Sequence, residues 1–418
     1  MNKKSKKAAA DVAFSFIDEA LAKGFTLLGF GIAAYLFDKE FLGVLGVATA
    51  MQVALTYANV LPENILMRDK KNDHETNKID AYLQFWVIKF AVLMLATLVA
   101  SWAFRTDKMP LFTVALIVTG LQYLSTSFTE SIKFFYFLEF KNKESLRLSV
   151  ISNSILVLSM GSIFIFPTRE YYLILLSVIS IAKIAFWFLV YRHHFNFRFR
   201  LPTAAIWPII KQSLKSYTIY FHIIALCMSF VYDFDLLILQ YFQVPLNKIG
   251  EYSIVVKMTY INTLLPIIMQ RYLVARMRHL SETEIQAQFG KIMLSFTAVG
   301  LALMAVFTIG GREFMRIVFN STDLDFTYPI MLIILGGATI INIFRPYVAY
   351  SLSRLPIRKY LFQFVIPVSA FSLISYLVLS KTFGVMGTAW GNVVSYSTYG
   401  LGNYFFVKYH RSKNRQIQ

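Results

Sequence analysis

The sequence predicts an all-α polytopic membrane protein with about twelve transmembrane helices. Of its 418 residues, 57% are hydrophobic and only 15% are charged, which is too few to cover the surface of a soluble domain of this size. A helix needs about 20 apolar residues to cross the hydrocarbon core of a bilayer. Stretches of about that length without Asp, Glu, Lys or Arg recur at 41–62, 109–129, 148–168, 292–311, 360–380 and 382–407.

The twelve expected spans follow from these stretches and from the charged residues that bound them. They are 12–36, 41–67, 79–104, 110–138, 148–166, 171–191, 216–242, 249–274, 292–309, 326–352, 360–379 and 384–407. The first follows a basic start that is typical of a signal peptide. However, Asp11, Asp18, Glu19 and Lys23 interrupt any apolar core there. We therefore interpret 12–36 as a retained first helix.

The distribution of basic residues predicts that both termini are cytoplasmic. With the N-terminus inside, the cytoplasmic segments hold 27 of the 41 Lys and Arg residues, and the external loops hold 8. Arg271, near the end of its span, is counted with the cytoplasmic group. The net charge of +18 is thus mostly a consequence of topology, and we expect no nucleic-acid partner.

The chain divides near its middle into two expected domains. A basic cytoplasmic linker at 192–215, which contains Pro202 and Pro208, separates six helices at 1–191 from six at 216–418. At an offset of 207 residues, the identities are Gly43 with Gly250, Met51 with Met258, Thr56 with Thr263 and Leu66 with Leu273. Since six spans separate equivalent positions, the halves are expected to be parallel repeats.

Three stretches resemble the Wzx-type oligosaccharide-flippase branch of the multidrug/oligosaccharidyl-lipid/polysaccharide (MOP) exporter superfamily. The first, 37–71, reads FDKEFLGVLGVATAMQVALTYANVLPENILMRDKK, with a short acidic outer turn, a glycine that opens the second helix and a basic end. The second, 233–277, reads DFDLLILQYFQVPLNKIGEYSIVVKMTYINTLLPIIMQRYLVARM and is similar to the matching hairpin of the second half. The third, 383–410, reads FGVMGTAWGNVVSYSTYGLGNYFFVKYH and is similar to the glycine-rich last helix.

This resemblance implies two six-helix bundles of the MATE/MOP type around a central cavity. That cavity would open alternately inward and outward to move undecaprenyl-diphosphate-linked oligosaccharide, an O-antigen-like repeat unit, across the bacterial inner membrane. The resemblance also implies a role in lipopolysaccharide assembly, with a polysaccharide polymerase and a chain-length regulator as partners. Twelve spans favour this branch over the lipid II flippases, which commonly have fourteen.

Six basic residues lie within the expected spans and are not explained by topology. An ionisable side chain in a span usually faces a wet cavity or a partner. We expect five of these residues to line a cationic substrate-binding cavity, namely Lys23, Lys89, Lys183, Lys257 and Arg345. Two alternatives stay open, a Glu19–Lys23 ion pair at i,i+4 and snorkelling of Arg345 toward the cytoplasm. The sixth, Lys133, we interpret as a salt bridge to Glu130.

A group of cations suits a diphosphate, because it replaces the water lost by an anion that must cross hydrocarbon. Arginine can grip phosphate bidentately, whereas lysine acts as a mobile point charge. Acidic residues are candidates either for H⁺ or Na⁺ coupling or for counter-ions to the lysines: Asp18, Glu19, Glu63, Glu130, Asp233 and Asp235. The lone Cys227 and six scattered histidines predict no catalytic residue, metal site or cofactor.

Three other classes of membrane protein are alternatives to a flippase. A multidrug cation extruder of the same superfamily should have an acidic, aromatic cavity, which the surplus of basic residues in the spans disfavours. A membrane-embedded polysaccharide polymerase should have a large external loop or paired catalytic carboxylates. A major-facilitator carrier should have a glycine- and arginine-rich loop after its second span, where this sequence has RDKKNDHETNKIDA.

Overall fold

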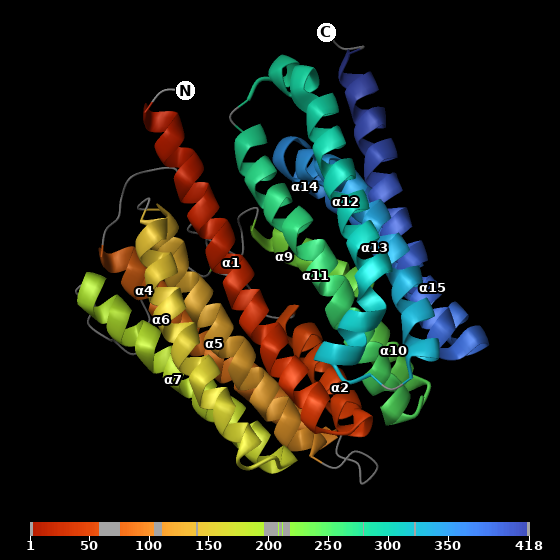
Figure 1. Ribbon diagram of the computed structural model, residues 1–418. Coiled ribbons are helices and arrows are strands. Elements are labelled where there is room, and N and C mark those ends of the chain that lie inside the picture. The colour runs from red at the N-terminus through yellow and green to blue at the C-terminus, as the bar shows by residue number, and fades with distance from the viewer. Residues whose placement is uncertain are drawn as a thin grey trace. The chain divides into compact units, whose positions relative to one another are not determined.

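The computed structural model describes residues 3–57, 76–103, 111–138, 141–195, 208, 211, 218–278, 280–321 and 323–415. All regular secondary structure in these ranges is helical, which confirms the predicted all-α class (Figure 1). Within the same ranges, nine helices are long and apolar enough to cross a membrane. The number is ten when the bent pair α9–α10 is counted as one span.

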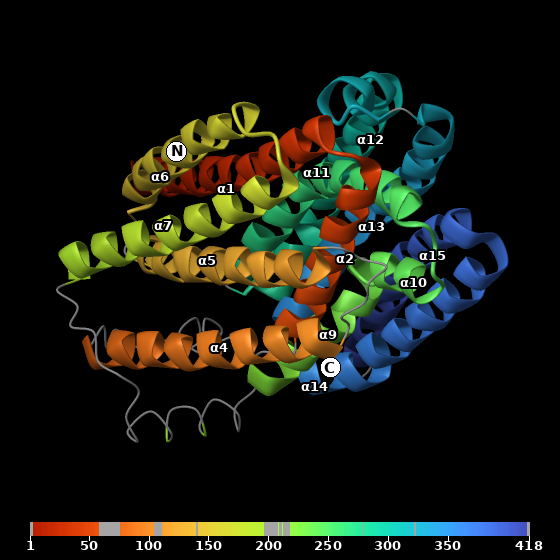
Figure 2. The ribbon, with the colours of Figure 1, turned by 90° about the horizontal axis from the view of Figure 1, so that it is seen from below.

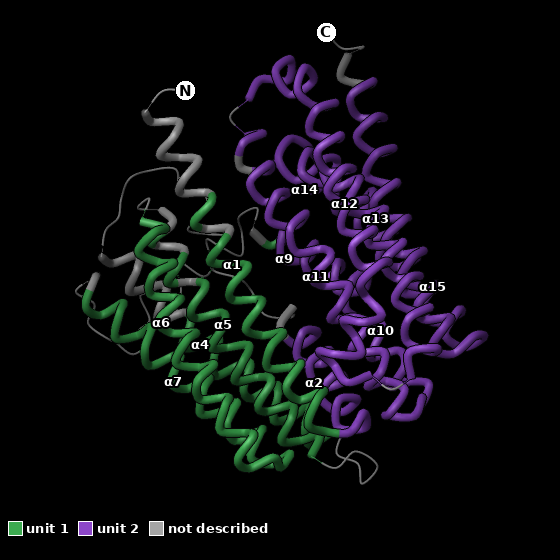
Figure 3. The backbone as a smooth tube through the Cα atoms, in the orientation of Figure 1, with its two compact units in different colours: residues 1–37, 58–219 green, residues 38–57, 220–418 purple. Residues whose placement is uncertain are grey.

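The helices form two compact units, residues 1–37 with 58–219 and residues 38–57 with 220–418 (Figure 3). The first unit contains α1 (Lys3–Leu36), α4 (Thr76–Ala103), α5 (Phe112–Leu138), α6 (Asn142–Met160), the 3₁₀ turn η1 (Gly161–Phe164) and α7 (Arg169–Phe195). The second contains α2 (Lys39–Tyr57), α9 (Thr218–Tyr232), α10 (Asp235–Tyr241), α11 (Leu246–Met277), α12 (Glu282–Val318), α13 (Leu324–Arg354), α14 (Ile357–Tyr360), the π turn η2 (Leu361–Val365) and α15 (Ile366–Arg415).

Aromatic packing fixes the faces of three helices in the first unit. There α5 packs against α4 and α7, and these helices lie side by side in Figure 2. The buried rings of Trp86, Phe128 and Trp187 belong to one cluster, and the first two have centroids 4.6 Å apart. Residues three or four apart share a helix face. Lys89, three residues after Trp86, and Lys183, four before Trp187, therefore lie on the faces that this cluster turns inward.

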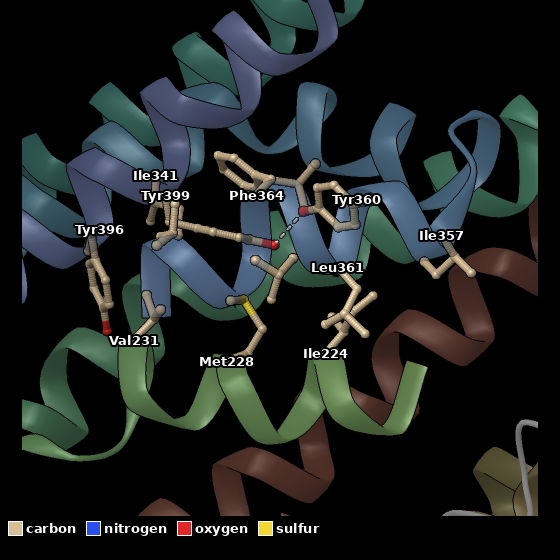
Figure 4. Close-up of a cluster of buried hydrophobic side chains, with 14 residues drawn as sticks. Ile224, Met228, Val231, Ile341, Ile357, Tyr360, Leu361, Phe364, Tyr396 and Tyr399 are labelled. Carbon is tan, nitrogen blue, oxygen red and sulfur yellow. Dashed lines mark hydrogen bonds between the residues drawn. The ribbon is translucent and has the colours of Figure 1, made fainter. Parts of the chain in front are cut away.

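The second unit is built around α13, which packs against α11, α12 and α15. Its core combines apolar side chains with tyrosines, as Figure 4 shows. The Tyr360 and Tyr399 hydroxyls lie 3.2 Å apart, and Tyr360 also donates to Asn403 Oδ1 at 3.0 Å. These buried hydroxyls have partners, as buried polar groups in hydrocarbon must.

Three of the twelve expected spans have irregular helices. The span expected at 216–242 is broken into α9 and α10, which meet at 60° around Asp233 and Phe234. The last two spans run on as α15, a 50-residue helix bent at Gly384, where φ is +57°. That left-handed backbone suits glycine, since other residues pay a steric cost there. The bend separates 360–379 from 384–407 as predicted.

The compact units depart from the expected halves at one helix, α2. It belongs to the first half of the sequence but packs against α11 and α10 of the second. A Cβ on Gly43 would lie 2.1 Å from the Leu246 carbonyl oxygen, and one on Gly250 would lie 1.8 Å from the Lys39 carbonyl oxygen. Leu246 lies four residues before Gly250, and Lys39 lies four residues before Gly43. The crossing is therefore symmetric at the offset of 207 residues, and it excludes any side chain at either position.

Loops expected on one side of the membrane meet within the second unit. Lys39 Nζ donates to the carbonyls of Phe319 and Asn320 at 3.0 and 2.9 Å, and Lys248 pairs with Asp323 at 2.7 Å. All of these residues fall in or beside loops expected to be external. On the side expected to be cytoplasmic, Glu282 at the start of α12 pairs with Arg411 near the end of α15 at 3.2 Å. The contacts therefore agree with the loop assignment inside this unit.

Candidate functional site

The first unit has a buried ion pair that joins three helices. Lys133 Nζ on α5 lies 2.7 Å from Asp18 Oδ1 on α1, and the Ser145 hydroxyl on α6 donates to Asp18 Oδ2 at 3.1 Å. The exposed fractions of the two charged side chains are 11% and 8%. This contact corrects the interpretation of Lys133 as a local partner of Glu130, because its ion pair reaches across to Asp18 on α1.

Lys183 on α7 belongs to the same cluster. Its ammonium group interacts electrostatically with Lys133, Glu130, Lys23 and Asp18. The predicted residues Asp18, Lys23, Glu130 and Lys183 are thus brought together, and Lys133 joins them. Lysines from α1, α5 and α7 therefore gather here with carboxylates from α1 and α5.

Lys89 is a second buried cation in the first unit. It is 2% exposed on α4, and its Nζ donates to the Ser127 hydroxyl on α5 at 3.3 Å. Trp86 and Phe128 lie beside these two residues in sequence and form part of the aromatic cluster. The position agrees with the expected mid-span lysine.

In the second unit, Asp235 begins α10 just after the bend. It is 2% exposed, its Oδ1 accepts from the Leu236 amide at 2.8 Å, and its Oδ2 accepts from the Tyr252 hydroxyl at 3.1 Å. Lys257, half-buried on α11, interacts with Asp235 electrostatically. The structure therefore brings two predicted residues together, an acid and a base, from the stretch that resembles the second family hairpin.

Arg345 on α13 is 4% exposed and lies apart from these carboxylate contacts. Its Nε donates to Asn342 Oδ1 at 3.0 Å, and its Nη1 donates to Gln270 Oε1 on α11 at 2.7 Å. Burial and these two contacts answer the snorkelling alternative, because the guanidinium points into the unit rather than to its surface. Sequence reasoning missed Asn342, Gln270 and their neighbour Asn262.

The other predicted acidic residues are less informative. Asp233 is half-buried at the bend between α9 and α10, and Glu19 is half-buried on α1. Glu63 lies outside the described residues. The roles assigned to all of these side chains stay predictions.

No family model and no curated protein matches the sequence. Solved structures do match over nearly the whole chain. An inward-facing multidrug resistance MATE family transporter of the MOP superfamily is 14% identical and covers 96% of both chains, with a TM-score of 0.63. Lipid II flippase MurJ, inward closed, is 13% identical over 95% of this chain and 87% of its own, with a TM-score of 0.65. Eukaryotic MATE transporter AtDTX14 is 12% identical over 100% and 99%, with a TM-score of 0.62.

At sequence identities of 12–14%, the similarity to these structures shows the fold. The chain therefore has the fold of MOP-superfamily transporters, as the sequence led us to expect, and it is a multi-pass helical membrane protein by composition and fold.

Proposed function

We propose that this protein is a transporter that flips an undecaprenyl-diphosphate-linked oligosaccharide, an O-antigen-like repeat unit, from the cytoplasmic to the periplasmic leaflet. It works by alternating access through a cationic cavity, in the manner of a Wzx-type flippase. It resides in the bacterial inner membrane with both termini in the cytoplasm. It acts beside a polysaccharide polymerase and a chain-length regulator in lipopolysaccharide assembly, and its transport is coupled to H⁺ or Na⁺.

The single observation that carries this proposal is the gathering of lysines within the helices of the first unit. In the first unit, Lys133 and Lys183 both interact with Asp18, Lys183 also interacts with Lys23, and Lys89 is buried on α4 of the same unit. A charged group in a membrane span is costly and is retained for function. The cations can replace the lost hydration of a diphosphate, whereas they would repel the lipophilic cation of a multidrug extruder.

Replacing Lys89 or Lys183 by alanine is expected to reduce transport at least tenfold while leaving the amount of protein in the membrane unchanged. The reason is that each removes one cation from the path of the diphosphate. Translocation of a labelled undecaprenyl-diphosphate-linked sugar in proteoliposomes measures the effect, and surface glycan display measures it in cells. Lys381→Ala, an exposed lysine with the same loss of charge, serves as the control.

Wild-type transport in both Lys89→Ala and Lys183→Ala would eliminate the cationic-cavity mechanism. Loss of resistance to lipophilic cations on deletion of the protein, with glycan display unchanged, would instead establish the multidrug extruder.

A further inference from the structure

The second unit buries a guanidinium that no carboxylate neutralises among the described residues. The interactions of Arg345 are with amide oxygens, with the Tyr232, Tyr396 and Tyr399 hydroxyls and with another base, Arg271. Burying an unpaired charge costs several kcal/mol, so a structural arginine in a core normally has a carboxylate partner. The absence of one from the described part of this unit leaves a full positive charge inside it.

The groups that hold Arg345 orient it without neutralising it. Asn342 Oδ1 takes the Nε hydrogen and Gln270 Oε1 takes an Nη1 hydrogen, so two neutral side chains fix the plane of the guanidinium. Its Nη2 is buried and has no hydrogen-bond partner in the described structure. Arginine presents paired N–H groups in a rigid fork that matches an oxyanion. The Nε and Nη1 groups thus have acceptors, whereas Nη2 has none among the described residues.

A second unsatisfied donor, the side-chain amide of Asn262 on α11, lies next to Asn342. Asn342 Nδ2 donates to the Asn262 backbone carbonyl at 3.4 Å, and Asn262 itself is fully buried. Both side-chain amide atoms of Asn262 lack a partner within the described residues. An unsatisfied buried amide costs about 1–3 kcal/mol, so such a group calls for an explanation. With Arg345 Nη2, the seam between α11 and α13 offers more donors than acceptors and a net positive charge.

Both helices are weakened at this level by proline. Pro266 lies four residues after Asn262, and Pro346 lies four residues after Asn342. Proline has no N–H, so neither asparagine carbonyl receives its usual helical hydrogen bond. Proline positions are where helices bend. The unused donors are buried in this conformation, and bending of α11 and α13 at these prolines would expose them.

We propose that Arg345 and Asn262 form a binding site for a phosphoryl oxyanion within the second unit, with Gln270 and Asn342 as positioning residues. This inference rests on the proposed function in that it assigns the diphosphate of the lipid-linked substrate a contact distinct from the lysine cluster. The same chemistry is carried by an acidic phospholipid head group. The two sources differ in that only the substrate carries the diphosphate on an isoprenyl chain.

The test measures binding to the full-length protein in nanodiscs of zwitterionic lipid. The probes are inorganic pyrophosphate, farnesyl diphosphate and, in separate nanodiscs, phosphatidylglycerol. Arg345→Gln is expected to weaken farnesyl diphosphate binding at least tenfold, and Arg345→Lys is expected to weaken it less. Arg358→Gln removes an exposed charge from the neighbouring α14 and should bind as the wild type does. A dependence on Arg345 for phosphatidylglycerol, with none for farnesyl diphosphate, would overturn the substrate assignment.

Asn262→Leu separates a binding role from a structural one. If Asn262 is a ligand donor, the leucine variant should bind farnesyl diphosphate at least threefold more weakly and yet unfold at a higher temperature, because it removes unsatisfied buried polar atoms. Unchanged binding in folded Asn262→Leu and Arg345→Gln proteins would overturn the site. Flipping activity is scored separately. An intact binding site in a protein that does not flip lipid-linked sugar refutes the proposed function and leaves this site standing.

Discussion

Oxidation of a Gly46→Cys/Ser253→Cys pair, made in a Cys227→Ala background, is expected to reduce transport at least tenfold, and a reductant should restore it. A Cβ on Gly46 would lie 3.3 Å from Ser253 Cβ, close to the separation in a disulfide. The bond would join α2 to α11 at the end of the second unit expected to face the periplasm. Translocation of labelled lipid-linked sugar before and after reduction measures the effect.

The reason for this expectation is the place of α2 in the chain. It belongs to the first half of the sequence, yet its Gly43, the equivalent of Gly250, packs against the Leu246 backbone of α11. Alternating access moves two repeats against each other about a fixed site. A symmetric contact between equivalent helices of the two repeats is the contact that such a movement must break. A disulfide across it should therefore arrest the cycle.

A disulfide at another close crossing provides the control. A Cβ on Gly337 of α13 would lie 3.5 Å from Val393 Cβ of α15, and both helices come from the second half of the sequence. Gly337→Cys/Val393→Cys should keep wild-type transport after oxidation. Full activity of the oxidised Gly46–Ser253 variant would mean that α2 and α11 move as one piece and that the outer end opens elsewhere.

The helices were predictable from sequence because the bilayer imposes their length. Each expected span needs its own run of apolar residues, and each backbone polar group must be satisfied within its helix. The described helices therefore follow the expected spans, including the break at Gly384. The partner helix of α2 was not predictable, since close packing of Gly43 on α11 depends on the three-dimensional arrangement. The signal lay in the alignment of Gly43 with Gly250.

The contents of the site were predictable in part. A charged side chain is energetically costly in a membrane span, and this alone marks Asp18, Lys89, Lys183 and Arg345 as unusual. Which charge meets which was not predictable, since it depends on helix rotation. Lys133 was matched to Glu130 along one helix, whereas its ion pair is with Asp18 on another. The amides around Arg345 had a sequence signal that went unused, an asparagine four residues before a proline in both α11 and α13.

Asp18→Ala is expected to destabilise the protein strongly, by about 3–5 kcal/mol, because it leaves the Lys133 ammonium buried without its partner. A lower thermal unfolding temperature in nanodiscs measures this loss. Glu313→Ala removes one partner of the exposed Glu313–Arg316 pair on α12 and should cost no more than about 1 kcal/mol. An equally small effect at Asp18 would mean that water solvates Lys133 in the folded protein.

The double variant Asp18→Asn/Lys133→Met then decides whether Asp18 is a counter-ion or couples transport to an ion. It removes both charges together, and Asn still accepts the hydrogen bond from Ser145. Neutral replacement of a buried pair is often harmless to stability, so the unfolding temperature should return to near the wild-type value. If Asp18 only balances Lys133, transport returns together with the stability.

We expect instead that transport stays at least tenfold below wild type and loses its dependence on the proton or sodium gradient. In that case the charged pair is needed for transport and not merely for the fold, and the lost gradient dependence assigns the coupling to the Asp18 carboxylate. Recovery of both stability and gradient-driven transport would assign coupling to another residue, with Asp235 as the next to test.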